Sequence, residues 1–143
     1  MSVLNSVSIP ALLLTSIVVA SVLVYVPYLF VAYARLTAPS GYDRSAPRAM
    51  ELPAYAQRAN WAHQNGFESF MIFSIAALMA YVAGENSGQE SMTVVYGAIA
   101  YLIARFLYAV AYIVDIPTMR SLMFGIGNIG IITLFTFSIR SVL

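Results

Sequence analysis

The residues Arg58-Ala-Asn-Trp-Ala-His-Gln-Asn-Gly-Phe-Glu-Ser-Phe70 place polar and ionisable side chains at the start of a long apolar segment. Ionisable residues at membrane depth are costly, and they usually serve a function. On a helix that turns about 100° per residue, one polar stripe roughly 80° wide is formed by Arg58, Trp61, Asn65 and Glu68. His63 points to a different side. A purely structural role, in which the stripe joins helices by hydrogen bonds, is equally consistent with this pattern.

The composition around this stretch is that of a membrane protein. The chain has 143 residues, of which 61% are hydrophobic and 9% are charged. This length suits a single bundle-sized domain, residues 1–143. The net charge of +1 and the lack of a basic run predict no nucleic-acid partner. The sequence has no cysteine and one histidine, so we expect no disulfide, no catalytic protein thiolate and no metal site.

Four segments are long and apolar enough to cross a hydrocarbon layer of about 30 Å. We predict an all-α integral membrane protein, a four-helix bundle with helices at about 11–35, 54–84, 91–114 and 121–140. The connections are a Pro-rich polar loop from Thr37 to Pro53, a polar turn from Glu85 to Glu90, and a break at Asp115-Ile-Pro117. Four spans place both termini on the same side of the membrane.

The distribution of arginines predicts which side that is. Arg44 and Arg48 lie in the first connection, with Arg35 and Arg58 at its edges. The third connection adds Arg120, whereas the opposite side has only Arg140. The positive-inside rule therefore places the first and third connections in the cytoplasm and both termini on the non-cytoplasmic side.

The third predicted helix carries a second unusual pattern. Helical spacing puts four of its side chains on one face, namely Tyr101, Arg105, Tyr108 and Tyr112. An aromatic packing stripe with a snorkelling arginine is the alternative to a functional site. In the fourth helix, Gly125, Gly127 and Gly130 favour close helix packing, within the chain or at a subunit contact.

Taken together, these motifs resemble the MAPEG family, the membrane-associated proteins in eicosanoid and glutathione metabolism. Arg58-x-x-Trp-Ala-His-x-Asn-x-x-Glu68 resembles its second-helix signature. Arg105-x-x-Tyr108-x-x-x-Tyr112, followed by Pro117 and Arg120, resembles its third-helix signature, and Tyr33-x-Arg35-Leu-Thr is similar to microsomal glutathione transferases. The resemblance implies a homotrimer in the lipid bilayer, with glutathione bound between subunits near the cytoplasmic face.

The resemblance also implies roles for individual residues. Arg120 is similar to the arginine that stabilises the glutathione thiolate, and Arg35 to a first-helix arginine close to the thiol. The expected glutathione-binding residues are Arg58, His63, Asn65, Glu68, Arg105, Tyr108 and Tyr112. A free thiol has a pKa of about 8.5, so a neighbouring arginine would favour the reactive thiolate. The expected activity is conjugation or reduction of a hydrophobic electrophile that arrives from the bilayer.

One departure from the family pattern affects these expectations. Trp61 occupies the position of an arginine that normally meets a carboxylate of glutathione, and its loss costs on the order of 1.5–3 kcal/mol. Arg58, on nearly the same face, is the candidate replacement. Ser69 stands where some members have a tyrosine, which weakens the similarity to leukotriene C4 synthase. The alternative is therefore a non-catalytic MAPEG-fold protein that binds lipid or has a structural role, and a helical bundle outside the family remains a third reading.

Overall fold

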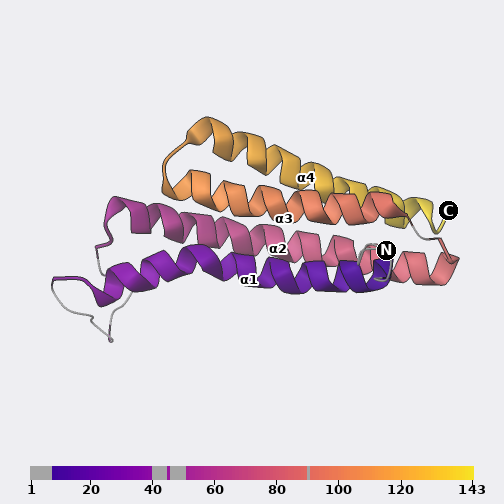
Figure 1. The fold of residues 1–143 in the computed structure, drawn as a ribbon, viewed down its shortest axis with the longest axis horizontal. Helices are drawn as coiled ribbons and strands as arrows, with labels where there is room; N and C mark the ends of the chain where they lie inside the picture. Colours follow the sequence, from indigo (N-terminus) through magenta and orange to yellow (C-terminus); the bar gives the residue numbers. More distant parts are fainter. Residues whose placement is uncertain (1–7, 40–44, 46–50, 90) are drawn as a thin grey trace, which may run out of the picture.

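The computed structural model describes residues 8–39, 45, 51–89 and 91–143, and it shows four helices. They are α1 (Ile9–Leu36), α2 (Ala54–Ser87), α3 (Met92–Ile113) and α4 (Pro117–Arg140). The helices run up and down along one axis, so that α1 begins and α4 ends at the same end of the bundle (Figure 1). All four are long and apolar enough to cross a membrane. This confirms the predicted fold class.

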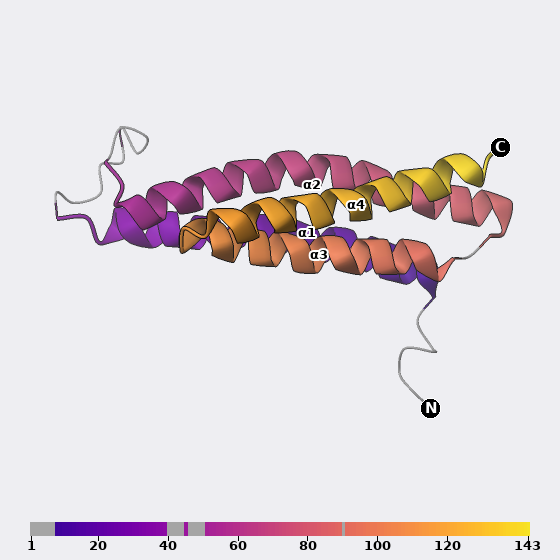
Figure 2. The ribbon, with the colours of Figure 1, turned by 90° about the horizontal axis from the view of Figure 1, so that it is seen from above.

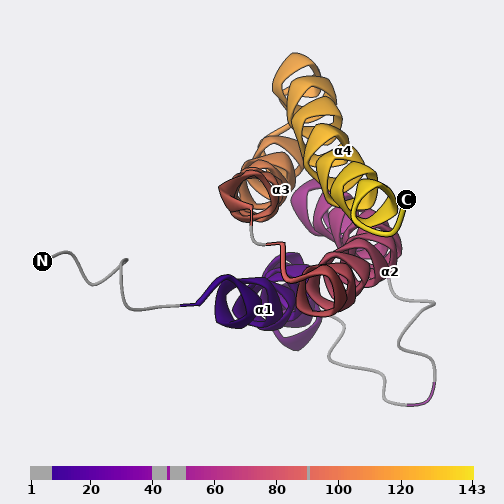
Figure 3. The same ribbon diagram turned by 90° about the vertical axis from the view of Figure 1, so that its right-hand side faces the viewer.

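The helices pack so that only one pair remains apart. Within the described residues, every pair of helices is in contact except α1 and α4. The end-on view shows α1 and α4 on opposite sides, with α2 and α3 beside each of them (Figure 3). Seen from above, α4 starts over α3 and ends beside α2 (Figure 2). Residues at the start of α4 therefore lie far from α1.

The core is built from small residues and one aromatic stack. The inward face of α2 consists largely of buried alanines, among them Ala76, Ala77 and Ala80. These small side chains let α2 approach its neighbours, because lipid provides little hydrophobic force between helices. The stack is formed by Phe73 and Tyr101, whose rings are parallel within 3° with centroids 3.8 Å apart. It joins α2 to α3 near the middle of both helices.

Two glycines set the distance between α3 and α4. A Cβ atom on Gly130 would lie 2.5 Å from the carbonyl oxygen of Gly97, and one on Gly97 would lie 3.2 Å from the carbonyl oxygen of Gly130. The predicted packing role holds within this chain for Gly130 and for Gly127, whose Cβ would contact Arg105. It does not hold for Gly125, which faces open space with nothing within 4 Å.

Two helix boundaries differ from the sequence prediction. We expected α2 to end near Gly84, but it continues to Ser87 and ends at Gly88, whose φ of 63° is left-handed. Gly84 is the earlier glycine but keeps helical geometry, so α2 runs past the approximate end that we predicted. We expected α4 to begin at roughly Ser121, but it begins at Pro117, because proline suits the first turn of a helix. Arg120 therefore belongs to the first turn of α4 and not to the connection.

The predicted orientation in the membrane partly concerns residues that the structure does not cover. Arg44 and Arg48, which contribute to the predicted cytoplasmic side, lie outside the described residues. The outer surface of the described helices carries large apolar side chains on all four helices. Such a surface suits contact with lipid, and the chain is an integral, multi-pass membrane protein.

Candidate functional site

Arg105 is the buried charge at the centre of the bundle. Arg105 is only 8% exposed. Its Nη2 donates hydrogen bonds to two oxygens of Asn65, the backbone carbonyl at 3.0 Å and Oδ1 at 2.8 Å. Its Cζ lies 4.5 Å from the centre of the Tyr108 ring, which adds a cation–π contact. Two predicted site residues of α3 and one of α2 are thus brought together.

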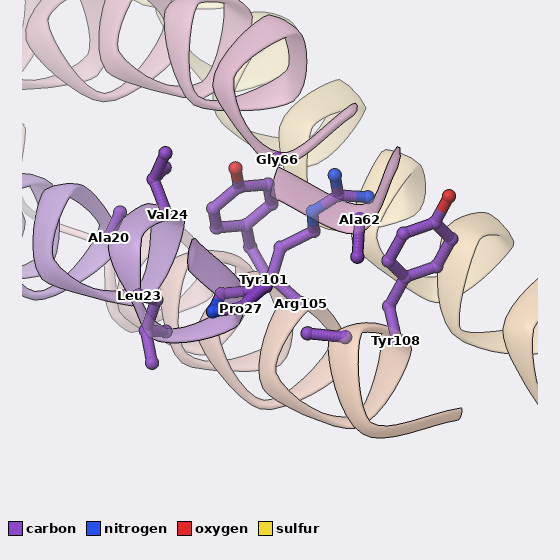
Figure 4. Close-up of a pocket in the computed structure, with 10 residues that line it drawn as sticks. Ala20, Leu23, Val24, Pro27, Ala62, Gly66, Tyr101, Arg105 and Tyr108 are labelled. Atoms are coloured by element: carbon purple, nitrogen blue, oxygen red, sulfur yellow. The ribbon is translucent and has the colours of Figure 1, made fainter. Parts of the chain in front are cut away.

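A small cavity lies beside this arginine, between α1, α2 and α3 (Figure 4). Figure 4 shows Tyr101, Arg105 and Tyr108 of α3 facing Gly66 of α2 and the Pro27 region of α1. The volume of the cavity is about 20 Å³. That volume holds about one water molecule. A tripeptide such as glutathione therefore does not fit in this cavity.

Tyr101 forms the inner wall of this cavity. Its hydroxyl lies 3.2 Å from Oγ of Ser69, and its ring stacks on Phe73. Ser69 occupies the position where some relatives of the resembled family have a tyrosine. Here the serine supplies a hydrogen-bond partner for a buried phenol. Tyr101 and Ser69 thus have a packing role, which is the alternative reading for this part of the α3 stripe.

His63 faces α1 and not the polar stripe, as the helical spacing predicts. Its Nδ1 lies 2.7 Å from the carbonyl oxygen of Val24 and must donate, because a carbonyl can only accept. Its ring packs against Tyr25 and Tyr28 of α1, with centroids 5.5 Å and 5.1 Å away. His63 therefore joins α2 to α1 within one chain.

Arg35 lies close to the C-terminal end of α1, and it contacts Tyr28, which also packs against His63. Its Nη1 donates to the hydroxyl of Tyr28 at 3.3 Å. Its Nε is buried, and no hydrogen-bond partner for it exists among the described residues. A buried donor without a partner is unusual, and each case calls for an explanation. The Nε–H group of Arg35 is therefore a donor that the described residues leave unsatisfied.

Arg58 and Arg120 lie at the same end of the bundle as Arg35, around the turn between α3 and α4. Nε of Arg58 donates to the carbonyl oxygen of Ile113 at 3.0 Å, and its Nη1 is 3.7 Å from Oδ2 of Asp115. Cζ of Arg120 lies 4.6 Å from the centre of the Tyr112 ring. The Tyr112 ring in turn meets the edge of the Tyr108 ring, with centroids 5.5 Å apart. A chain of contacts thus runs from Arg120 through the tyrosines to Arg105.

The other two members of the polar stripe are exposed. Trp61 is 46% exposed, and Glu68 is also exposed on the outer side of α2. Among the described residues, Glu68 forms no ion pair. Neither residue forms a hydrogen bond or ion pair with the buried cluster around Arg105 among the described residues, but Glu68 lies close enough to Tyr108 to interact with it electrostatically. A ligand that contacts Trp61 would lie on the outer surface of α2.

The structure thus separates the predicted residues into groups. One group contains Asn65, Arg105, Tyr108, Tyr112 and Arg120, and another contains His63 and Arg35 against α1. Sequence reasoning missed Tyr28 and Asp115 as partners of the arginines. The separation of Tyr28 and Arg35 by seven positions, two helical turns, was the available signal for their contact.

Comparison with known proteins gives one match. A family model described as the MAPEG family matches residues 12–140 of this chain. No curated protein and no solved structure matches the chain. The family match covers nearly the whole described bundle, including every predicted site residue.

Proposed function

The chain belongs to the MAPEG family, and from this premise we propose that it is a membrane glutathione transferase or peroxidase. The substrates would be hydrophobic electrophiles or hydroperoxides that are dissolved in the bilayer. The observation that carries the proposal is a set of cationic and phenolic side chains gathered at one end of the bundle. They are Arg58, Tyr108, Tyr112 and Arg120. Glutathione is a small anion with a thiol, and it suits such a set.

The proposed chemistry needs a thiolate and a positioned electrophile. Arg120 is the first candidate for stabilising the thiolate, because an arginine stays charged at every relevant pH. Arg35 is the second candidate, and its Nε–H group has no hydrogen-bond partner among the described residues. Conjugation forms a bond from the sulfur to the electrophile and releases its leaving group. With a hydroperoxide, two glutathione molecules become the disulfide while the hydroperoxide becomes an alcohol and water.

The geometry supports a site that is shared between copies of the chain. The cavity beside Arg105 has room for about one water molecule. Arg35 and Arg120 stand on α1 and α4, which do not touch each other in the described part of the chain. If both act on one thiol, they come from neighbouring copies. This agrees with the expected homotrimer and with glutathione bound between subunits.

The exposed side of α2 offers a surface for such an assembly. Side chains at alternating intervals of four and three residues all face outward along this helix. They are Gln57, Trp61, Gln64, Glu68, Met71, Ile75, Leu78 and Val82. This spacing is the heptad pattern of helices that pack against one another. Glu68 lies near the middle of α2, where an exposed carboxylate facing lipid is costly, so a neighbouring copy is its expected cover.

A second candidate function is a non-catalytic MAPEG-fold protein that binds lipid or has a structural role. The specific observation in its favour is Trp61, which replaces the expected arginine and lies exposed on α2. The two readings differ in whether glutathione binds at all. If Arg58 is the replacement, Arg58→Ala abolishes glutathione binding while Trp61→Arg changes it little. A large gain of affinity in Trp61→Arg would instead indicate a site that has drifted from glutathione.

The deciding experiment is ultraviolet difference absorbance of the purified protein during titration with glutathione. We expect a saturable thiolate band in the wild type and none in Arg120→Ala. Isothermal titration of Arg120→Ala should still show binding, because the arginine would act on the sulfur and not on the rest of the tripeptide. A wild type without the band and without heat of binding would favour the lipid-binding or structural reading.

A further inference from the structure

The turn after α3 keeps an aspartate where a glycine would be more usual. Asp115 has a φ of 64°, and it is the one non-glycine residue with positive φ in the described chain. Its N–H donates to the carbonyl of Tyr112 at 3.3 Å, and the N–H of Ile116 donates to the carbonyl of Ala111 at 2.8 Å. These two bonds form a Schellman motif, whose left-handed position is usually occupied by glycine. The turn therefore carries a carboxylate at a position that usually has no side chain.

The carboxylate of Asp115 faces Arg58, whose guanidinium is held by a hydrogen bond to the backbone of α3. Nε of Arg58 donates to the carbonyl of Ile113 at 3.0 Å. That carbonyl belongs to the last turn of α3, where it lacks a partner within the helix. Because Nε is engaged, the orientation of the guanidinium is fixed. Its outer edge, with Nη1 and Nη2, then presents a fork that matches a carboxylate.

Asp115 occupies this outer edge only loosely. Its Oδ2 lies 3.7 Å from Nη1 of Arg58, which is beyond hydrogen-bond distance. The side chain of Asp115 is 59% exposed and that of Arg58 is 25% exposed, so water and salt screen the pair. A ligand carboxylate that makes direct, charge-assisted hydrogen bonds to the same edge would interact more strongly. The internal pair is therefore weak enough to be exchanged.

We propose that Asp115 is an exchangeable internal counter-ion of Arg58, and that it sets how tightly this end of the bundle binds a carboxylate. The identity of the ligand, glutathione, rests on the proposed function, whereas the competition itself needs only a carboxylate. Removing the charge of Asp115 frees the outer edge of the guanidinium. An exposed ion pair of this kind corresponds to a gain in affinity of about two- to fivefold.

The test uses isothermal titration of the full chain in bilayer discs of zwitterionic lipid at low salt, with glutathione and separately with glutarate. Asp115→Asn and Asp115→Gly both remove the charge, and both residues accept the left-handed backbone. Glu51→Gln is the matched control, because Glu51 is an exposed acid before α2 with no ion pair to Arg58. Each variant is also measured with Arg58→Ala, and with glutathione diethyl ester, which lacks free carboxylates.

The proposal predicts a tightening of about two- to fivefold for both Asp115 variants, which exceeds that of Glu51→Gln. The gain should vanish with the diethyl ester, and in the Arg58→Ala background neither Asp115 variant should bind glutathione more tightly than Arg58→Ala alone. A gain equal to that of Glu51→Gln, or one that persists without Arg58, would overturn the proposal. Binding of glutarate but not of glutathione, with the gain intact, would overturn the proposed function and leave this inference standing. Failure of both anions to bind Asp115→Asn would overturn the inference.

Discussion

Replacement of Gly130 by alanine tests the packing that brings α3 and α4 together. The new Cβ would lie 2.5 Å from the carbonyl oxygen of Gly97, 3.3 Å from the backbone nitrogen of Tyr101 and 3.4 Å from its Cβ. The nearest of these atoms belongs to the backbone, so a side-chain rotation cannot relieve the contact. The helices must separate by roughly 1 Å to restore normal contact distances. Such overpacking costs about 1–3 kcal/mol.

Thermal unfolding in a mild detergent, followed by near-ultraviolet circular dichroism, measures this effect. Gly125→Ala is the control, because its Cβ meets nothing within 4 Å and alanine is favoured over glycine in a helix by about 1 kcal/mol. We expect Gly130→Ala to unfold at a lower temperature than the wild type, and Gly125→Ala to unfold at the same or a higher temperature. Equal stability of Gly130→Ala and the wild type would refute the reasoning.

Three further outcomes can be checked. Asn65→Ala should lower the free energy of unfolding by about 1–3 kcal/mol, because Arg105 loses a charge-assisted hydrogen bond. Asn65→Asp should retain most of the stability. An alanine variant as stable as the wild type would contradict this prediction. His63→Phe keeps the ring against Tyr25 and Tyr28 but loses the bond to Val24, so we expect a loss of about 1 kcal/mol in denaturant unfolding, smaller than that of His63→Ala. A cysteine at Glu51 in this cysteine-free chain should react with an impermeant reagent only from the cytoplasmic side, and one at Gln89 only from the opposite side; the reverse pattern would invert the predicted topology.

The helices and the buried face of α3 could be predicted from the sequence for a simple reason. Hydropathy marks a span by length alone, and the helical period places Tyr101, Arg105 and Tyr108 together whatever they pack against. All three are buried in the structure. The separate direction of His63 follows from the same period. These are properties of a single helix, and a single sequence contains them.

Contacts between helices could not be predicted in the same way. The bond from Arg105 to Asn65 depends on how far α2 has slid along α3, and tertiary packing decides that. The end of α2 depends on which of two glycines adopts the left-handed conformation. The hydrogen bond from Arg58 to the carbonyl oxygen of Ile113 involves a backbone atom, and the residue type at position 113 does not predict such a contact. The family resemblance named the arginines, but it did not give the partners that each one has within the chain.

The separation of α1 from α4 has a genetic consequence. If every site takes Arg35 from one copy and Arg120 from the next, chains that lack only Arg35 and chains that lack only Arg120 are each inactive alone. Co-expressed in one cell, they would assemble at random into rings. About a quarter of the sites would then receive both intact arginines, and partial activity would return without any wild-type chain. Two defective alleles would complement each other, whereas a site contained within one chain would remain silent in every mixture.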